Sequence, residues 1–258
     1  MGVMRLLIVV IAAILLSAGA AAAGDYEDGA AAYYRGDFAT AKRLWLPLAE
    51  QGDAKAQTGL GLLYFLGQGV NMNLAAALDW SSKAAAQGLP VAQYELGQFY
   101  QHPWDPEIRD LGEAFKWYSR AADQGYANAQ DELGGMYEFG LGAPRDYAEA
   151  EKWFAKAGDY YSIAKMYDDV AQNRPLAAKW YRKLADQGDK YAMFRLGEMY
   201  RDGEGVLRDY ATAHMWFNLA AESGYRYAST ARDELARKMT PDQIARTERL
   251  ARDWKPIR

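Results

Sequence analysis

The stretch that decides the fold of this chain reads Ala192-Met193-Phe194-Arg195-Leu196-Gly197-Glu198-Met199-Tyr200. Its apolar residues recur every three or four positions, so they share one face of a helix. The Leu-Gly pair, with a tyrosine three residues after the glycine, also occurs at Leu60-Gly61, Leu96-Gly97 and Leu133-Gly134. The four leucines are 36, 37 and 63 residues apart, and the longest interval contains a further unit around Ile163. Self-similarity at this period is typical of stacked helical hairpins.

A second helix is predicted in each unit, and a tryptophan marks it. This residue recurs at Trp80, Trp117, Trp153, Trp180 and Trp216. Seven residues before each tryptophan stands a strong helix N-cap residue: Asn73, Asp110, Asp146, Asn173 or Asp209. Glycine in the middle of a helix costs roughly 1 kcal/mol relative to alanine. The repeated Leu-Gly pair therefore predicts that the two helices of a unit approach each other closely at the glycine.

The two ends of the chain depart from this pattern. In the first unit Asp37 is the predicted cap and Leu44 occupies the tryptophan position, so six hairpins extend from about Tyr26 to Gly224. Near the C-terminus, Thr240 to Gln243 reads as a capping box with proline at the first helical position. A final amphipathic helix is therefore expected from Pro241 to Asp253.

The combined pattern resembles the Sel-one-like repeats, a family related to the tetratricopeptide repeat, and the chain is identified as an exported bacterial member. The resemblance rests on Ala-x-x-x-Leu-Gly-x-x-Tyr, Gly-x-Gly-Val, Asp-x-x-x-Ala-x-x-Trp-[Tyr/Phe]-x-x-Ala-Ala and Gln-Gly, repeated along the chain. It implies an all-α fold, an αα-superhelix (solenoid) of about six to seven hairpins with a C-terminal capping helix. The solenoid is expected over residues 24–225 and the capping helices over residues 226–258. Two units depart from the pattern: His102 to Pro106 replace the glycine turn after Leu96, and the unit around Ile163 lacks that turn.

Residues 1–23 are predicted to be a secretory signal peptide. Arg5 precedes an 11-residue apolar run from Leu6 to Leu16, and Ala21-Ala22-Ala23 offers a cleavage site before Gly24. The chain is therefore expected to be exported, and we expect a periplasmic location. A secreted protein, or one anchored by the uncleaved N-terminal segment, remains an alternative, and membrane association is expected only in the anchored case.

Composition excludes several classes of function. The chain has no cysteine, which rules out disulfides and thiol chemistry. Its net charge of −4 disfavours general nucleic-acid binding, which requires a basic surface. His102 and His214 are its two histidines, and a metal site needs three or four converging ligands. We therefore predict no metal site, no cofactor and no catalytic residues.

An enzymatic alternative rests on Ser162-x-x-Lys165, which matches a string found in penicillin-recognising enzymes. The Lys-Thr-Gly and Ser-Asp-Asn elements that accompany it in those enzymes are missing. Ile163 also occupies the leucine position of the repeat, which places the string on an ordinary first helix. A cell-wall enzyme, penicillin-binding or hydrolytic, is therefore the second hypothesis.

The leading hypothesis is a non-enzymatic scaffold or adaptor for a protein or peptide. In stacked hairpins of this kind the first helices line the concave face, and the positions two before, two after and five after each repeat leucine are expected to be exposed there. The candidate partner-binding residues at these positions are Phe65, Tyr94, Asp131, Glu138, Tyr161, Phe194, Glu198 and Arg201. The same positions in the unit around Ile163 also hold Lys165 and Asp168. An aromatic recurs at the first position, and rigid aromatics are favoured binding anchors, whereas packing against the neighbouring repeat is the alternative explanation. The family resemblance implies adaptor or regulatory work in the envelope.

Overall fold

The structure is a computed structural model, and it describes residues 24–101 and 109–256. Within these ranges every regular element is a helix and no strand occurs, so the predicted all-α repeat fold is confirmed. The predicted signal peptide and the irregular segment that begins at His102 lie outside the described residues. Contacts divide the chain into two compact units, one ending at Arg145 and the other beginning at Asp146.

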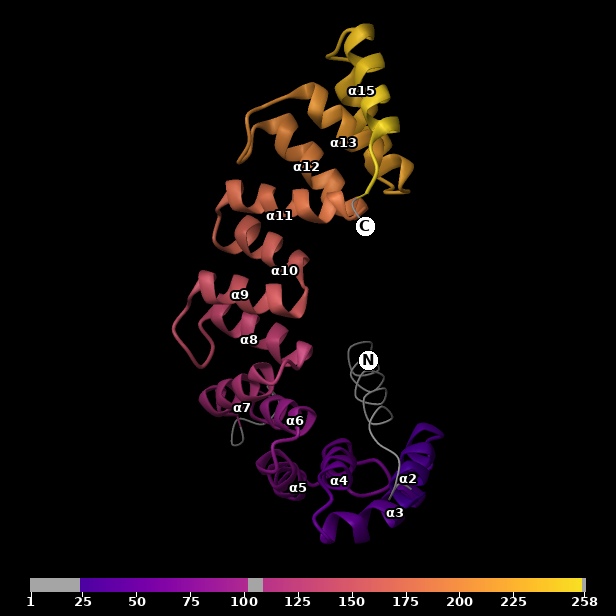
Figure 1. The fold of residues 1–258 in the computed structure, drawn as a ribbon, viewed down its shortest axis with the longest axis vertical. Coiled ribbons are helices and arrows are strands. Elements are labelled where there is room, and N and C mark those ends of the chain that lie inside the picture. Colours follow the sequence, from indigo (N-terminus) through magenta and orange to yellow (C-terminus); the bar gives the residue numbers. More distant parts are fainter. Residues whose placement is uncertain (1–23, 102–108, 257–258) are drawn as a thin grey trace. The chain divides into compact units, whose positions relative to one another are not determined.

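Unit 1 consists of consecutive helical hairpins (Figure 1). Its helices are α2 (Gly24–Tyr34), α3 (Phe38–Glu50), α4 (Ala54–Leu66), α5 (Leu74–Ala86), α6 (Pro90–Gln101), α7 (Leu111–Asp123) and α8 (Ala127–Phe139). Helix α2 packs on α3, α4 on α5 and α6 on α7, and α8 packs on α7. The unit therefore has the architecture that the repeat predicts.

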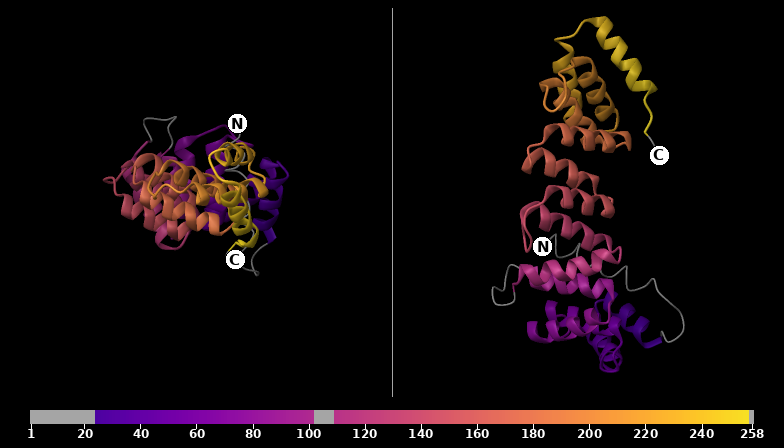
Figure 2. Two further views of the ribbon diagram at one scale, coloured as in Figure 1. Left: turned by 90° about the horizontal axis from the view of Figure 1, so that it is seen from above. Right: turned by 60° about the vertical axis from the view of Figure 1, so that its left-hand side comes forward.

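Unit 2 follows the same plan with one irregular hairpin. Its helices are α9 (Tyr147–Ala157), α10 (Tyr160–Lys165), the π-helix η1 (Met166–Val170), α11 (Arg174–Asp186), α12 (Lys190–Asp202), α13 (Tyr210–Glu222), α14 (Ala228–Ala236) and α15 (Pro241–Asp253). Helix α15 lies against α13, as the right-hand view of Figure 2 shows. The capping box at Thr240 and Gln243 is present, which confirms the last predicted helix. The division at residue 225 between solenoid and capping helices stays a prediction.

Side-chain caps start the second helices as the sequence predicts. Each of the capping side chains accepts a hydrogen bond from a backbone N–H in the first turn of its helix: Asp37, Asn73, Asp110, Asp146, Asn173 and Asp209. Such a cap stabilises a helix by about 1 kcal/mol. These hairpins are therefore defined largely by local interactions.

Close approach at the Leu-Gly glycine is also confirmed. A Cβ atom on Gly97 would lie 2.7 Å from the ring of Tyr118, and one on Gly197 would lie 2.5 Å from the ring of Phe217. Both rings belong to the residue that follows the repeat tryptophan. In the first hairpin Trp45 takes this place, and its ring leaves no room for a Cβ on Gly29. The residue after the tryptophan, and not the tryptophan itself, thus fills the space between the paired helices.

The hairpin around Ile163 replaces the glycine turn with the π-helix. Ala171 N–H donates to the carbonyl of Met166 over 2.8 Å, and Asn173 N–H donates to that of Tyr167 over 2.7 Å. Gln172, with φ of 51°, is the non-glycine residue at positive φ among those described. In the next hairpin the equivalent turn uses Gly203 and Gly205 at φ of 76° and 72°. Single π-helical turns of this kind are frequent at functional sites.

None of the helices in the described ranges has the length and apolar character that a membrane span requires.

Candidate partner-binding face

A row of aromatic rings crosses the first helices of unit 2. Tyr161 on α10 lies 5.7 Å from Tyr191 on α12, measured between ring centroids, and Tyr191 lies 6.1 Å from Tyr225. Tyr227 follows at 5.8 Å from Tyr225. The side chains at the two ends are exposed, Tyr161 by 45% and Tyr227 by 51%. We call these four tyrosines the aromatic row.

Charged residues on α12 lie on the same helix face as one member of this row. Phe194, Glu198 and Arg201 follow Tyr191 by three, seven and ten residues, a spacing that keeps side chains on one side of a helix. Phe194 lies 4.8 Å from Tyr225, so α12 contributes two neighbouring rings. The N-cap Asp189 accepts from the N–H of Ala192 over 2.7 Å and sets the start of this helix.

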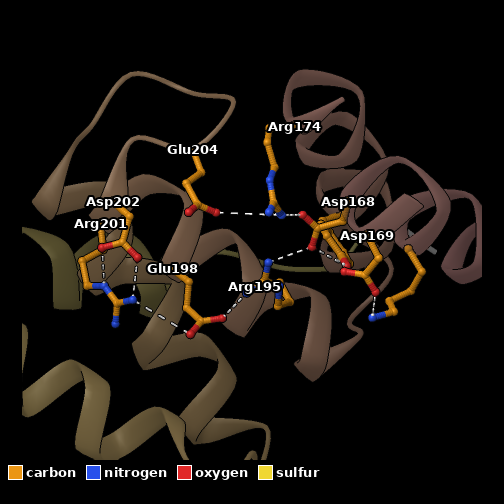
Figure 3. Close-up of polar contacts among 10 residues, drawn as sticks. Asp168, Asp169, Arg174, Arg195, Glu198, Arg201, Asp202 and Glu204 are labelled. Carbon is orange, nitrogen blue, oxygen red and sulfur yellow. Dashed lines mark hydrogen bonds and ion pairs between the residues drawn. The ribbon is translucent and has the colours of Figure 1, made fainter. Parts of the chain in front are cut away.

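Asp168 is the buried centre of a charged network (Figure 3). Its carboxylate pairs with the guanidinium of Arg174 from the start of α11 and with Arg195 Nη2 from α12 at 2.7 Å. The hydroxyl of Tyr181 donates to it over 3.2 Å. The π-helix carries Asp168, so the irregular hairpin places one carboxylate between two neighbouring helices.

From Arg195 the network continues along α12 toward the surface. Arg195 Nη1 donates to Glu198 Oε2 over 2.6 Å, and Arg201 Nη2 lies 2.6 Å from Asp202 Oδ2 (Figure 3). The hydrogen bonds from Arg201 lower the pKa of Asp202. Burial acts to lower the pKa of Arg195, but the interactions with Glu198 and Tyr181 together outweigh it, so the pKa is raised. These hydrogen bonds hold the side chains of both pairs in fixed positions.

Four of the predicted partner-binding residues come together in unit 2. Tyr161 belongs to the aromatic row, Phe194 packs against it, and Glu198 and Arg201 lie in the charged network. Phe194 also lies 5.4 Å from the buried ring of Phe217, so it supports the interior as well.

The expectation of exposure is wrong for most of the set, because Tyr161 alone among the eight candidates is exposed and Phe194, Glu198 and Arg201 are partly buried. Tyr94 is only 7% exposed, because its ring packs against Tyr118 and Tyr126 at 5.6 and 5.2 Å. Glu138 is buried as well, and Asp131 is partly buried. Phe65 is partly buried against Phe99, with ring centroids 4.4 Å apart.

Asp168 was also expected to be exposed and is buried. Here the cause is charge pairing, because Arg174 neutralises the carboxylate inside the fold. Three residues that join the predicted ones were not predicted from the sequence. Tyr191 and Tyr225 complete the aromatic row, and Arg195 joins Asp168 to Glu198. Tyr191 could have been found from its three-residue spacing to Phe194, whereas nothing local indicates that Arg195 meets Asp168.

Ser162 and Lys165 do not form a catalytic pair. The Ser162 hydroxyl donates to Asp159 Oδ2 over 2.5 Å, and the Lys165 ammonium pairs with Asp169. The bond to Asp169 raises the pKa of Lys165, which keeps the amine protonated. A lysine that activates a serine has to be deprotonated, so this environment opposes that role.

His214 has a structural role. It is buried on α13, and its Nδ1 lies 2.8 Å from the hydroxyl of Thr247 on α15. Burial lowers the pKa of His214, so the ring is neutral at pH 7 and can share this hydrogen bond. Among the residues placed by the structure, no three His, Cys, Asp or Glu side chains are arranged to hold a metal ion.

These observations define a class: an all-α repeat protein with an aromatic and charged surface on its first helices. Five Sel1 repeats match this chain, at residues 54–89, 90–126, 127–159, 160–189 and 190–225. The chain therefore belongs to the Sel1 repeat family. Hairpin α2–α3 precedes the first matched repeat and has the same construction.

Solved structures agree with this assignment. The chain is similar to a protective antigen of uropathogenic Escherichia coli strains that displays an SLR fold, with 31% identity, a TM-score of 0.64, and coverage of 89% of this chain and 53% of the antigen. It thus spans about half the length of that antigen. It is also similar to a Sel1 repeat protein from Oxalobacter formigenes, with 28% identity, a TM-score of 0.64, and coverage of 89% of this chain and all of the other. Sel1 repeat proteins generally mediate protein–protein interactions and are typically non-enzymatic scaffolds.

Proposed function

We propose that this chain is a non-enzymatic scaffold or adaptor that binds a protein or peptide partner through the aromatic row of unit 2. The observation that carries the proposal is the continuity of four tyrosine rings with exposed ends beside ionised side chains on α12. Binding energy concentrates in aromatic and arginine anchors, and fixed polar groups around them supply specificity. We also propose that the aromatic row belongs to the concave face, which the first helices of such repeats are expected to line.

Removing the exposed ends of the aromatic row should weaken partner capture without unfolding the chain. We expect Tyr161→Ala with Tyr227→Ala to reduce recovery of the specific partner at least tenfold in an affinity pull-down from the native envelope, quantified by mass spectrometry. Helicity by circular dichroism should be unchanged, because neither ring is buried. Met72→Ala, an exposed apolar residue of unit 1, is the matched control.

Undiminished recovery by the folded double variant would exclude the aromatic row as the binding surface.

The cell-wall enzyme hypothesis is tested on the same preparation with a labelled penicillin. Acylation of the protein that is abolished by Ser162→Ala would favour that hypothesis. We expect no acylation, because Lys165 is held as an ammonium by Asp169.

We further propose that the chain is exported and works in the periplasm, in a regulatory or envelope-related role, with secretion as the alternative. The short apolar run and the alanine cleavage site of residues 1–23 support export. We expect the protein purified from the envelope fraction to have the intact mass of a chain that begins at Gly24. Recovery from the membrane pellet with residues 1–23 still attached would instead support the anchored form.

A further inference from the structure

Two lysine side chains of α11 lie beside the same indole ring. The ammonium of Lys179 lies 5.6 Å from the ring centroid of Trp180, and that of Lys183 lies 5.0 Å from it. The Lys183 ammonium is also 3.6 Å from the centroid of Tyr160, whose ring stacks on that of Trp180 at 5.6 Å. Both lysines are exposed. Two positive charges thus project from one aromatic cluster, which has no residue in common with the aromatic row.

These two charges are not neutralised within the fold. Neither lysine forms an ion pair with any of the described residues, whereas Arg182 on the same helix pairs with Asp186 at 2.9 Å. Lysines four positions apart are neighbours on a helix, and like charges at this spacing repel each other and destabilise it. One ammonium is enough for a favourable contact with an indole ring. Stabilisation of the ring therefore does not explain the second lysine.

Equivalent helices of other repeats pair a lysine at these positions with an acidic residue. The positions are those directly before the repeat tryptophan and three residues after it. The ion pairs found there are Lys83 with Asp79 at 2.7 Å, Lys116 with Glu113 at 2.6 Å and Lys152 with Glu149 at 3.0 Å. In α7 and α9 the acid stands four residues before the tryptophan, whereas Leu176 occupies that place in α11. The unbalanced charge of α11 is therefore a departure from the repeat.

The carboxylates of an acidic peptide segment match this pair of ammonium groups. Side chains on neighbouring turns of a helix are about 5–6 Å apart at Cβ. Carboxylates two residues apart in an extended segment are about 7 Å apart, so both can pair at once. The chain as a whole carries a net charge of −4, so it attracts an acidic segment only where positive charge is concentrated.

A membrane surface and a nucleic acid are poorer matches. Recognition of anionic lipids takes clusters of about four to eight basic residues, and a nucleic acid requires an extended basic surface. The indole of Trp180 is only 8% exposed, so it is not available to insert among lipids. Two ammonium groups on one helix are sufficient for a short acidic segment.

We propose that Lys179 and Lys183, held beside the stacked rings of Trp180 and Tyr160, bind an acidic peptide segment of a protein partner. The segment presents two carboxylates, two residues apart, to the two ammonium groups. Contact with the rings restrains the lysine side chains before binding, which lowers the entropy lost when the ion pairs form. This site and the aromatic row are separate surfaces, so either proposal can fail without the other.

The experiment measures binding of the labelled, blocked peptide Glu-Ala-Glu-Ala-Glu to the full chain by fluorescence anisotropy, with Gln-Ala-Gln-Ala-Gln as the neutral peptide. We expect the acidic peptide alone to bind, and its affinity to fall as salt is added, because exposed charges are screened. Lys179→Gln with Lys183→Gln should weaken binding at least tenfold. Lys83→Gln with Lys116→Gln is the matched control, because it changes the net charge equally at lysines that are already paired.

Three results would overturn the proposal. The first is equal affinity of the wild type and the α11 double variant, and the second is an equal loss of affinity in the control variant, which would show that net charge alone matters. The third is binding to phosphatidylglycerol vesicles, lost in the α11 double variant, without binding of the acidic peptide, which would indicate a membrane surface. Lys179→Gln alone should not lower the urea midpoint, since it relieves repulsion with Lys183. A lower midpoint would assign Lys179 a structural role and contradict the proposal.

Discussion

Replacing Trp216 with alanine is expected to lower the free energy of unfolding by about 3–5 kcal/mol, because the side chain is fully buried and the substitution leaves a large cavity. The indole lies 6.1 Å from that of Trp254, and the guanidinium of Arg182 lies 4.9 Å from its centroid. Its removal therefore also loosens the C-terminal residues that close unit 2. Urea denaturation at pH 7 measures the change.

Trp80 is the matched control, because it occupies the same position of another repeat. Its ring is only partly buried, and the ammonium of Lys83 lies 4.6 Å above it. We expect Trp80→Ala to cost less than about 2 kcal/mol, since water can fill the space that the ring leaves. Equal losses of unfolding free energy for the two variants would show that the repeat position, and not the burial of the individual ring, determines how much each tryptophan stabilises the fold.

Replacing Asp168 with alanine is expected to cost about 2–4 kcal/mol. Removal of one partner from a buried ion pair leaves uncompensated charge and typically costs 3–5 kcal/mol. Arg174 and Arg195 keep side-chain exposures of 38% and 21%, so they can regain part of their hydration, which reduces the loss. The same urea measurement tests this.

Asp169→Ala is the control for this prediction. Asp169 is the next residue along the π-helix, and its exposed carboxylate pairs with Lys165. Exposed pairs of this kind are worth at most about 1 kcal/mol. Asp168→Asn should fall between the two, because the amide oxygen can still accept from Tyr181. A loss at Asp168 no larger than that at Asp169 would mean that the buried network does not stabilise unit 2.

The local parts of this fold could be read from the sequence because their causes lie within a few residues. Asp110 caps α7 through the N–H of Glu113, only three positions away. The positive φ of Gly203 ends α12 in the same local way. The close approach at Gly97 could also be predicted, because a glycine that recurs inside a helix indicates a packing reason.

The family could also be recognised from the sequence alone. A repeat of one helical hairpin has essentially one way to bury its apolar faces, which is to stack on its copies. The period and the residues that recur with it are therefore enough to establish an all-α repeat protein of the Sel1 family.

The candidate sites depended on tertiary structure, because burial and charge pairing are properties of neighbours far apart in the sequence. Tyr94 and Tyr161 occupy the same repeat position, yet one is buried between other tyrosines and the other is exposed. Asp168 and Arg195 are 27 residues apart and meet only because a π-helix turns the carboxylate toward α12. Glu95 looks like any polar helix residue in the sequence, and only the packing of the helices buries it. The sequence alone thus determined the helices and the family, through caps, turns and period. The structure decided which side chains are available for binding, since that depends on how the helices pack.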